Sequence, residues 1–112
     1  HFYGYAARAM RQILVEHARR RNAMKRSGGY SAAEFAAMLE GKSGLPADLL
    51  IPLDAALEEL HRLDQASAKV VDLRYFLGCT WEETAEVMNL RVSVVRRNWD
   101  FAKAHLATRL ST

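Results

Sequence analysis

The side chains with the clearest capacity for chemistry are basic and polar groups in the last quarter of the chain, after a predicted turn at Asn89. Lysine and arginine bind phosphate, and a guanidinium can also bind the O6 and N7 atoms of guanine in the major groove. Polar side chains beside them can contact bases or the backbone. The chemistry indicated is recognition of DNA, and the candidate residues are Ser93, Arg96, Arg97, Asp100 and Lys103.

The residues before this segment have the spacing of a helix-turn-helix. Thr80 and Glu83 form a capping box, which predicts that a helix begins there. Ala85 is small enough to let two helices approach, Asn89 tolerates a positive φ, and Val95 can lock the second helix on the first. One side of the second helix is therefore expected to pack, through Val95, Trp99, Ala102 and Leu106, while the other can meet DNA.

Each candidate also has a structural interpretation. Ser93 can serve the start of its helix, and Asp100 can neutralise Arg96 or Arg97 at helical spacing. Lys103 can remain in solvent. Trp81 and Trp99 are expected to pack in the core rather than to stack on bases.

Composition narrows the class of protein. The chain has 112 residues, half of them apolar, which suits one ordinary domain or two very small ones. Abundant Ala, Leu, Glu and Arg and few β-branched runs predict an all-α fold. The single Cys79 excludes an internal disulfide and a multi-cysteine zinc site.

The sequence gives no sign of an enzyme, a cofactor or a membrane segment. It contains no nucleophile-base pair, no glycine-rich phosphate loop and no carboxylate pair, and its four histidines are not spaced as metal ligands. No apolar run approaches the roughly 20 residues of a membrane span, and no signal peptide is recognisable. We therefore expect a cytoplasmic, non-enzymatic protein without a cofactor or metal.

The chain has a net charge of +3, and its charged side chains are unevenly distributed along the sequence. Residues 1–26 carry seven basic side chains against one acidic, a balance of +6. Residues 48–86 carry three against nine, a balance of −6, and residues 91–109 carry five against one, a balance of +4. Two basic segments flanking an acidic one are compatible with nucleic-acid surfaces or with solvated helix faces.

The predicted elements run in a simple order. A long helix over residues 2–26 should end at Ser27-Gly28-Gly29, and a linker over 27–52 should contain a short helix capped by Ser31 and Glu34. Pro52 is expected in the first turn of a helix that continues from Leu53, and Asp64 is expected to cap the next helix. With the helix-turn-helix, residues 53–112 form a four-helix domain. The predicted apolar stripe of the first helix comprises Phe2, Tyr5, Ala6, Ala9, Met10, Ile13, Leu14 and Ala18.

Two segments of the sequence resemble a known family. Residues 64–78 followed by 80–85 are similar to region 4 of the bacterial sigma factors of the sigma-70 class, specifically the small extracytoplasmic-function (ECF) group. Residues 2–21 are similar to the last helix of region 2. The resemblance implies that the carboxy-terminal domain reads the minus-35 promoter element. It also implies that the first helix, through Arg19, Arg20 and Arg21, lies near the minus-10 element.

The chain departs from the family pattern at three points. Arg91 occupies the N-cap position of the recognition helix, where Ser or Thr is usual, so it can exchange capping for a phosphate contact. Val94 stands where Thr is common and can contact a thymine methyl group. Only the last helix of region 2 is recognisable, so we expect that this segment alone does not support initiation.

The sequence thus favours an ECF-type sigma factor, or a fragment of one, that directs bacterial RNA polymerase to promoters. The resemblance implies promoter DNA, the polymerase flap and an anti-sigma factor as partners. Apart from the resemblance, the first helix can also pair two copies of the fragment. Two alternatives stay open: a dimeric helix-turn-helix regulator that is not part of the polymerase, and a helical adaptor that does not bind DNA.

Overall fold

The computed structural model describes residues 2–21, 30–41 and 44–111. All of its regular elements are helical, which confirms the all-α prediction. In chain order they are α1 (Phe2–Arg20), α2 (Ala32–Glu40), α3 (Ala47–Leu63), α4 (Gln65–Val71), the π-helical turn η1 (Asp72–Phe76), α5 (Trp81–Met88) and α6 (Val92–Leu110).

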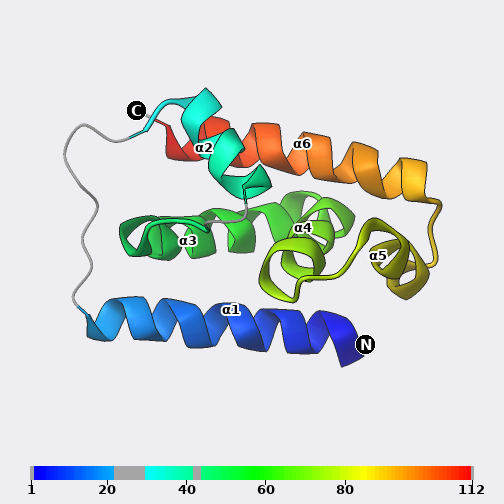
Figure 1. The fold of residues 1–112 in the computed structure, drawn as a ribbon, viewed down its shortest axis with the longest axis horizontal. Coiled ribbons are helices and arrows are strands. Elements are labelled where there is room, and N and C mark those ends of the chain that lie inside the picture. Colours follow the sequence, from blue (N-terminus) through cyan, green and yellow to red (C-terminus); the bar gives the residue numbers. More distant parts are fainter. Residues whose placement is uncertain (1, 22–29, 42–43, 112) are drawn as a thin grey trace.

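The helices are stacked in three layers. Figure 1 shows α1 along one side of the molecule, α3 and α4 in the middle, and α6 with α2 along the opposite side. The molecule measures 40 × 27 × 27 Å. Because α3, α4 and η1 lie between α1 and α6, they carry one helix on each face.

The main apolar cluster joins α2 to α6 through the middle layer. Phe35 of α2 is 1% exposed, and Leu53 of α3 and Val95 of α6 are fully buried in the same cluster. Helix α1 instead contributes small or short apolar side chains, Ala7, Val15 and Ala18, to its buried face. The short α2, which was predicted within a linker, is thus part of the core. The division of the chain into domains remains a prediction.

Three of the predicted helix starts are found where local capping chemistry places them. The hydroxyl of Ser31 accepts the backbone N–H of Glu34 and the carboxylate of Glu34 accepts that of Ser31, which completes a capping box. Thr80 and Glu83 form the same arrangement before α5. Asp64 caps α4 by accepting the N–H of Ser67 at 3.2 Å.

The prediction for Pro52 was wrong. Helix α3 begins at Ala47, so Pro52 lies inside the helix rather than in its first turn. A proline there lacks the N–H that would bond to the carbonyl of Asp48 and crowds that carbonyl. Burial of Leu49 and Leu53, which are 1% and 0% exposed, offsets this cost.

The predicted apolar stripe of α1 is mostly exposed rather than packed in the core. Of the predicted stripe only Ala18 is buried, whereas Phe2, Tyr5 and Ile13 are 75%, 81% and 63% exposed. The buried positions follow a neighbouring stripe that contains Arg11. Carboxylates of α3 and η1 set this rotation, because burying the apolar stripe would point Arg11 away from them and leave them without a cation. The predicted end of the helix at residues 27–29 lies outside the described residues.

The turn at Asn89 provides a test of the fold. Asn89 has φ 56° and ψ 46°, in the left-handed region that asparagine and glycine tolerate. We expect Asn89→Val to lower the free energy of unfolding by about 1–2 kcal/mol, whereas Asn89→Gly should stay close to the parent. Urea unfolding followed by circular dichroism measures the stability of both variants. Equal stability of the Val and Gly variants would contradict the left-handed conformation of Asn89.

Candidate nucleic-acid interface

A three-residue connection, which includes the predicted turn residue Asn89, joins α5 to α6. Backbone hydrogen bonds to the end of α5 hold this turn. The backbone N–H of Leu90 donates to the carbonyl of Ala85 at 2.9 Å, and the N–H of Asn89 donates to the carbonyl of Glu86 at 3.2 Å. Ala85 is 6% exposed and Val95 is fully buried, so the small residue and the locking residue take their predicted places.

Helix α6 has a buried side and an exposed side. Val95, Trp99, Ala102 and Leu106 are all buried, as the period predicted. The candidate residues are distributed over the remaining surface: Arg91, Ser93, Arg96, Arg97 and Asp100 are exposed, and Val94 and Lys103 are half-buried. Arg91 stands at the cap position and makes no side-chain capping hydrogen bond.

The basic end of α1 is distant from this surface. Arg19, Arg20 and Arg21 are exposed. Figure 1 places their end of α1 at the opposite end of the molecule from the start of α6. The structure therefore does not bring the two predicted groups of DNA-contacting residues together.

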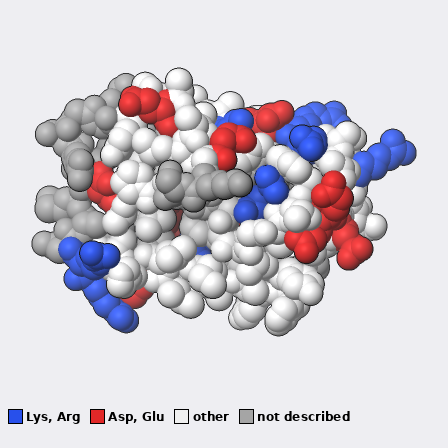
Figure 2. Space-filling view, in the orientation of Figure 1, with Lys and Arg blue, Asp and Glu red and all other residues white. Residues whose placement is uncertain are grey.

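Acidic side chains border the candidate surface. Glu82, Glu83 and Glu86 of α5 are exposed. Figure 2 shows acidic and basic side chains next to each other at the end of the molecule that holds α5 and the start of α6. Because these carboxylates repel phosphate, a duplex can approach more easily along α6 than along the outer side of α5.

Trp81 holds two arginines beside the start of α6. The Arg74 guanidinium lies 3.7 Å from the centre of the Trp81 ring, and that of Arg96 lies 4.6 Å from it. Trp81 also meets Trp99 edge to face, with ring centres 6.0 Å apart. Such cation–π contacts orient a guanidinium without neutralising its charge. Sequence analysis missed this arrangement because Arg74 and Arg96 lie on different helices.

A carboxylate of α2 contacts the flank of α6. Trp99 Nε1 donates to Oε1 of Glu40 at 2.5 Å, and Lys103 Nζ donates to the same oxygen at 2.8 Å. The hydrogen bond from Lys103, followed by that from Trp99, lowers the pKa of Glu40. The predicted DNA-contacting residue Lys103 is thus paired within the chain.

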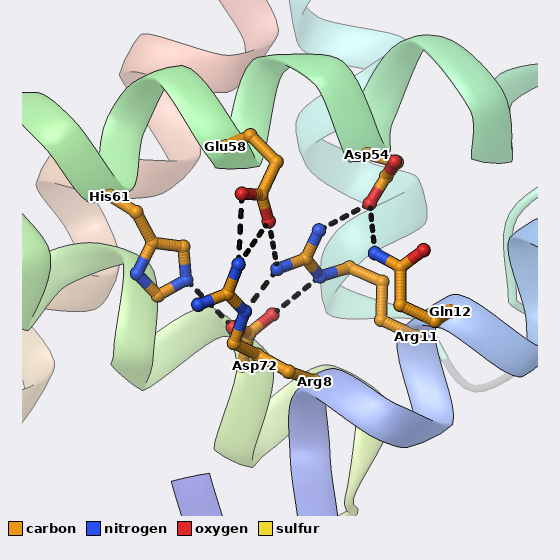
Figure 3. A network of polar contacts seen from close by, with 7 residues as sticks. All are labelled: Arg8, Arg11, Gln12, Asp54, Glu58, His61 and Asp72. Carbon is orange, nitrogen blue, oxygen red and sulfur yellow. Dashed lines mark hydrogen bonds and ion pairs between the residues drawn. The ribbon is translucent and has the colours of Figure 1, made fainter. Parts of the chain in front are cut away.

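On the opposite side of the middle layer, Arg11 is buried among three carboxylates (Figure 3). Its side chain is fully buried. Nε donates to Asp72 at 3.0 Å, Nη2 donates to Glu58 at 2.9 Å, and Nη1 donates to Asp54. A single guanidinium therefore joins α1 to both α3 and η1.

Further polar groups complete this network. Gln12 Nε2 donates to Asp54 at 3.1 Å, and Arg8 Nη2 binds both oxygens of Glu58 at 2.9 and 3.0 Å. His61 Nε2 lies 2.8 Å from Asp72 Oδ2. Sequence analysis missed the whole network. The available signal was that Arg11 shares a helical face with Ala7, Val15 and Ala18.

The network shifts the pKa of two of its members. Burial alone would raise the pKa of Glu58, but the hydrogen bond and charge of Arg11, with the charge of Arg8, lower it. Burial would likewise lower the pKa of Arg11, but Asp72, Glu58 and Asp54 raise it overall. Both groups are therefore held in their charged forms.

Neither a metal site nor a membrane span is found in the described part of the chain. No group of three or more His, Cys, Asp and Glu side chains there could hold a metal ion. None of the helices in those ranges is long and apolar enough to cross a bilayer.

The Arg11 network predicts a large effect of one substitution. Arg11→Met should lower the free energy of unfolding by about 3–5 kcal/mol, because it leaves Asp54 and Asp72 buried without their cation. Arg8→Met removes an exposed partner and should cost about 1 kcal/mol or less. Chemical denaturation of both variants measures the difference, and similar losses would contradict the special role of Arg11.

The lowered pKa of Glu58 predicts a dependence on acid. Because its pKa is lower in the folded than in the unfolded chain, ionised Glu58 stabilises the fold above the unfolded value of about 4.3. This stability is lost as the pH falls through the folded value. Acid titration followed by circular dichroism should show a weaker dependence in Glu58→Gln than in the parent; superimposable curves would argue against the assignment.

Comparison with known proteins identifies the family. A family model described as ECF sigma factor matches residues 1–112, the whole sequence. No curated protein and no solved structure matches the chain. ECF sigma factors are non-enzymatic transcription factors that act in initiation with RNA polymerase and promoter DNA. The match confirms the resemblance found in the sequence, and the chain belongs to the ECF sigma factor family.

Proposed function

We propose that this protein directs bacterial RNA polymerase to promoters by placing the start of α6 in the major groove of the minus-35 element. The observation that carries this proposal is the exposure of Arg96 and Arg97 on α6, while Val95 and Trp99 hold the helix in the core. The major groove is about 12 Å wide and admits one helix. A helix anchored on one side and basic on the other suits that position.

In the proposed complex with DNA, some exposed residues of α6 contact bases and others contact the DNA backbone. Arg97 reads a base, with Arg96 held by Trp81 beside it for a second base or a phosphate. Arg91, at the start of the helix, contacts the backbone, and Val94 meets a thymine methyl group. The remaining contacts come from Ser93, Asp100 and Lys103.

The basic end of α1 serves the minus-10 element through Arg19, Arg20 and Arg21. Elements centred at minus 10 and minus 35 are about 25 base pairs apart, or ~85 Å along B-DNA. With α1 packed on α3 and η1, the molecule is 40 Å long, so it cannot contact both promoter elements at once. Simultaneous contact requires α1 to separate from α3 and η1.

The helices of the middle layer offer the surface for other proteins. Over residues 53–77 they present a face to the polymerase flap, and an anti-sigma factor inhibits by covering the same face. Helix α1 already occupies part of this layer through the Arg11 network. In this role the protein acts in the cytoplasm, where the polymerase and chromosome are.

A second candidate is a dimeric regulator that binds DNA without the polymerase. It is favoured by the exposed apolar side chains of α1, among them Phe2, Tyr5 and Ile13. Exposed apolar residues at helical spacing are typical of a surface that pairs with another helix. This candidate requires a two-fold symmetric DNA site and no affinity for the flap.

One experiment separates these functions. We expect Arg96→Ala with Arg97→Ala to reduce affinity for a minus-35 duplex at least tenfold, since a base-reading arginine contributes about 1–3 kcal/mol. Binding to the isolated flap-tip segment should not change. The matched control, Arg62→Ala with Arg109→Ala, removes the same charge from exposed positions away from the start of α6. It is compared on the DNA duplex alone, because Arg62 lies in the segment proposed to face the flap.

The outcomes distinguish the alternatives. Loss of DNA binding in the Arg96 and Arg97 variant alone, with flap binding retained, supports the sigma-factor function. Equal losses in the two double variants would mean that only net charge matters and would overturn the assigned surface. DNA binding as a dimer without flap affinity would establish the regulator instead.

A further inference from the structure

The end of α2 places an acidic group against the DNA-facing helix. Glu40 is the last residue of α2, and its Oε1 accepts hydrogen bonds from Trp99 Nε1 and Lys103 Nζ. Both donors belong to α6 and lie about one turn apart. Their flank of the helix also carries Arg96, three residues before Trp99. The intramolecular contact thus borders the proposed DNA-reading surface.

The surroundings of Glu40 contain more positive charge than one carboxylate neutralises. Arg74 lines the same pocket as Glu40 and Trp99, and its charge helps to lower the pKa of Glu40. Arg74 and Arg96 lie on the Trp81 ring. The Nε atom of Arg74 is buried and has no hydrogen-bond partner among the described residues. Three cations and an indole N–H therefore gather here, and the anions that act on them are Glu40 and, beside Arg74, Glu82.

This donor set matches the chemistry of a phosphodiester. Backbone contacts to DNA use lysine and arginine side chains and neutral N–H groups around a phosphate oxygen. A carboxylate oxygen with two donors is an intramolecular equivalent of that arrangement. The Glu40 side chain is 48% exposed, so solvent weakens the contact and leaves the carboxylate exchangeable.

We propose that Lys103, Trp99 and Arg74 form a binding site for one phosphate of promoter DNA, which Glu40 occupies in the free protein. Binding of the duplex displaces the carboxylate, so the end of α2 acts as an autoinhibitory contact. The inference rests on the proposed binding of DNA by α6. It adds a backbone site and an internal competitor to that function.

The test compares two substitutions that remove the same charge. Glu40→Gln keeps an oxygen for the Trp99 N–H but loses the anion. Glu59→Gln is the matched control. Glu59 of α3 accepts a hydrogen bond at 2.6 Å from Arg109, which lies on α6 like Lys103 but at the end remote from Arg96. With the full chain and a minus-35 duplex, we expect Glu40→Gln to bind several-fold more tightly than Glu59→Gln.

Lys103→Ala tests whether the gain comes from the proposed site. In this variant the slope of log K against log salt should fall by about 0.9, the contribution of one phosphate. The gain from Glu40→Gln should disappear in the Lys103→Ala background. An indole N–H resonance assigned to Trp99 should also shift when DNA is added, because its acceptor changes. Glu40→Ala provides a second variant should the glutamine amide disturb the packing.

Other results overturn the proposal in distinguishable ways. Equal gains from Glu40→Gln and Glu59→Gln, or additive effects of Glu40→Gln and Lys103→Ala, would show that only general electrostatics is involved. The proposed binding of DNA by α6 would still stand in that case if Arg96→Ala with Arg97→Ala reduces affinity for the duplex at least tenfold. DNA binding that is insensitive to the Arg96 and Arg97 variant would overturn both proposals together.

Discussion

The arrangement of this molecule depends on the buried guanidinium of Arg11. Its side chain is fully buried, and it joins α1 to Asp54 and Glu58 of α3 and to Asp72 of η1. Helix α1 contributes only small or short apolar side chains to its buried face, so polar contacts rather than a large apolar interface fix its rotation. Buried carboxylates are costly without a cation, and this cost selects the face of α1 that turns inward. The more apolar stripe of the helix is exposed as a consequence.

The two ion-pair systems on either side of the middle layer differ in solvent exposure, and this difference separates their roles. Asp72 is 2% exposed and pairs with a fully buried Arg11, whereas Glu40 is 48% exposed where it meets Lys103. Breaking a buried pair costs about 3–5 kcal/mol, while an exposed pair contributes about 1 kcal/mol or less. The first contact therefore fixes the position of α1 in this arrangement and breaks only if α1 separates from α3 and η1, whereas the second can be exchanged for another anion. In the proposed sigma-factor function, the exchangeable contact lies on the helix that meets DNA.

Features controlled by neighbours in the sequence were predictable. The capping boxes at Ser31 and Thr80, the cap at Asp64 and the left-handed turn at Asn89 each depend on residues three or four positions apart. The buried side of α6 was also predictable, because large apolar side chains recur there without a competing stripe. These local rules were sufficient for the all-α fold and for the family resemblance.

Tertiary structure decided the features that depend on distant partners. Arg11 and Asp72 are 61 residues apart, and Glu40 and Lys103 are 63 apart. Helical periodicity allowed two overlapping stripes on α1, and only the carboxylates of other helices choose between them. Likewise, the interior position of Pro52 is stabilised by the burial of neighbouring leucines against other helices, which no local propensity reveals. The sequence by itself determined which helices form and which family they belong to. The folded chain decided which charges are buried and which basic groups of α6 are already paired, because those energies arise only when distant side chains lose water together.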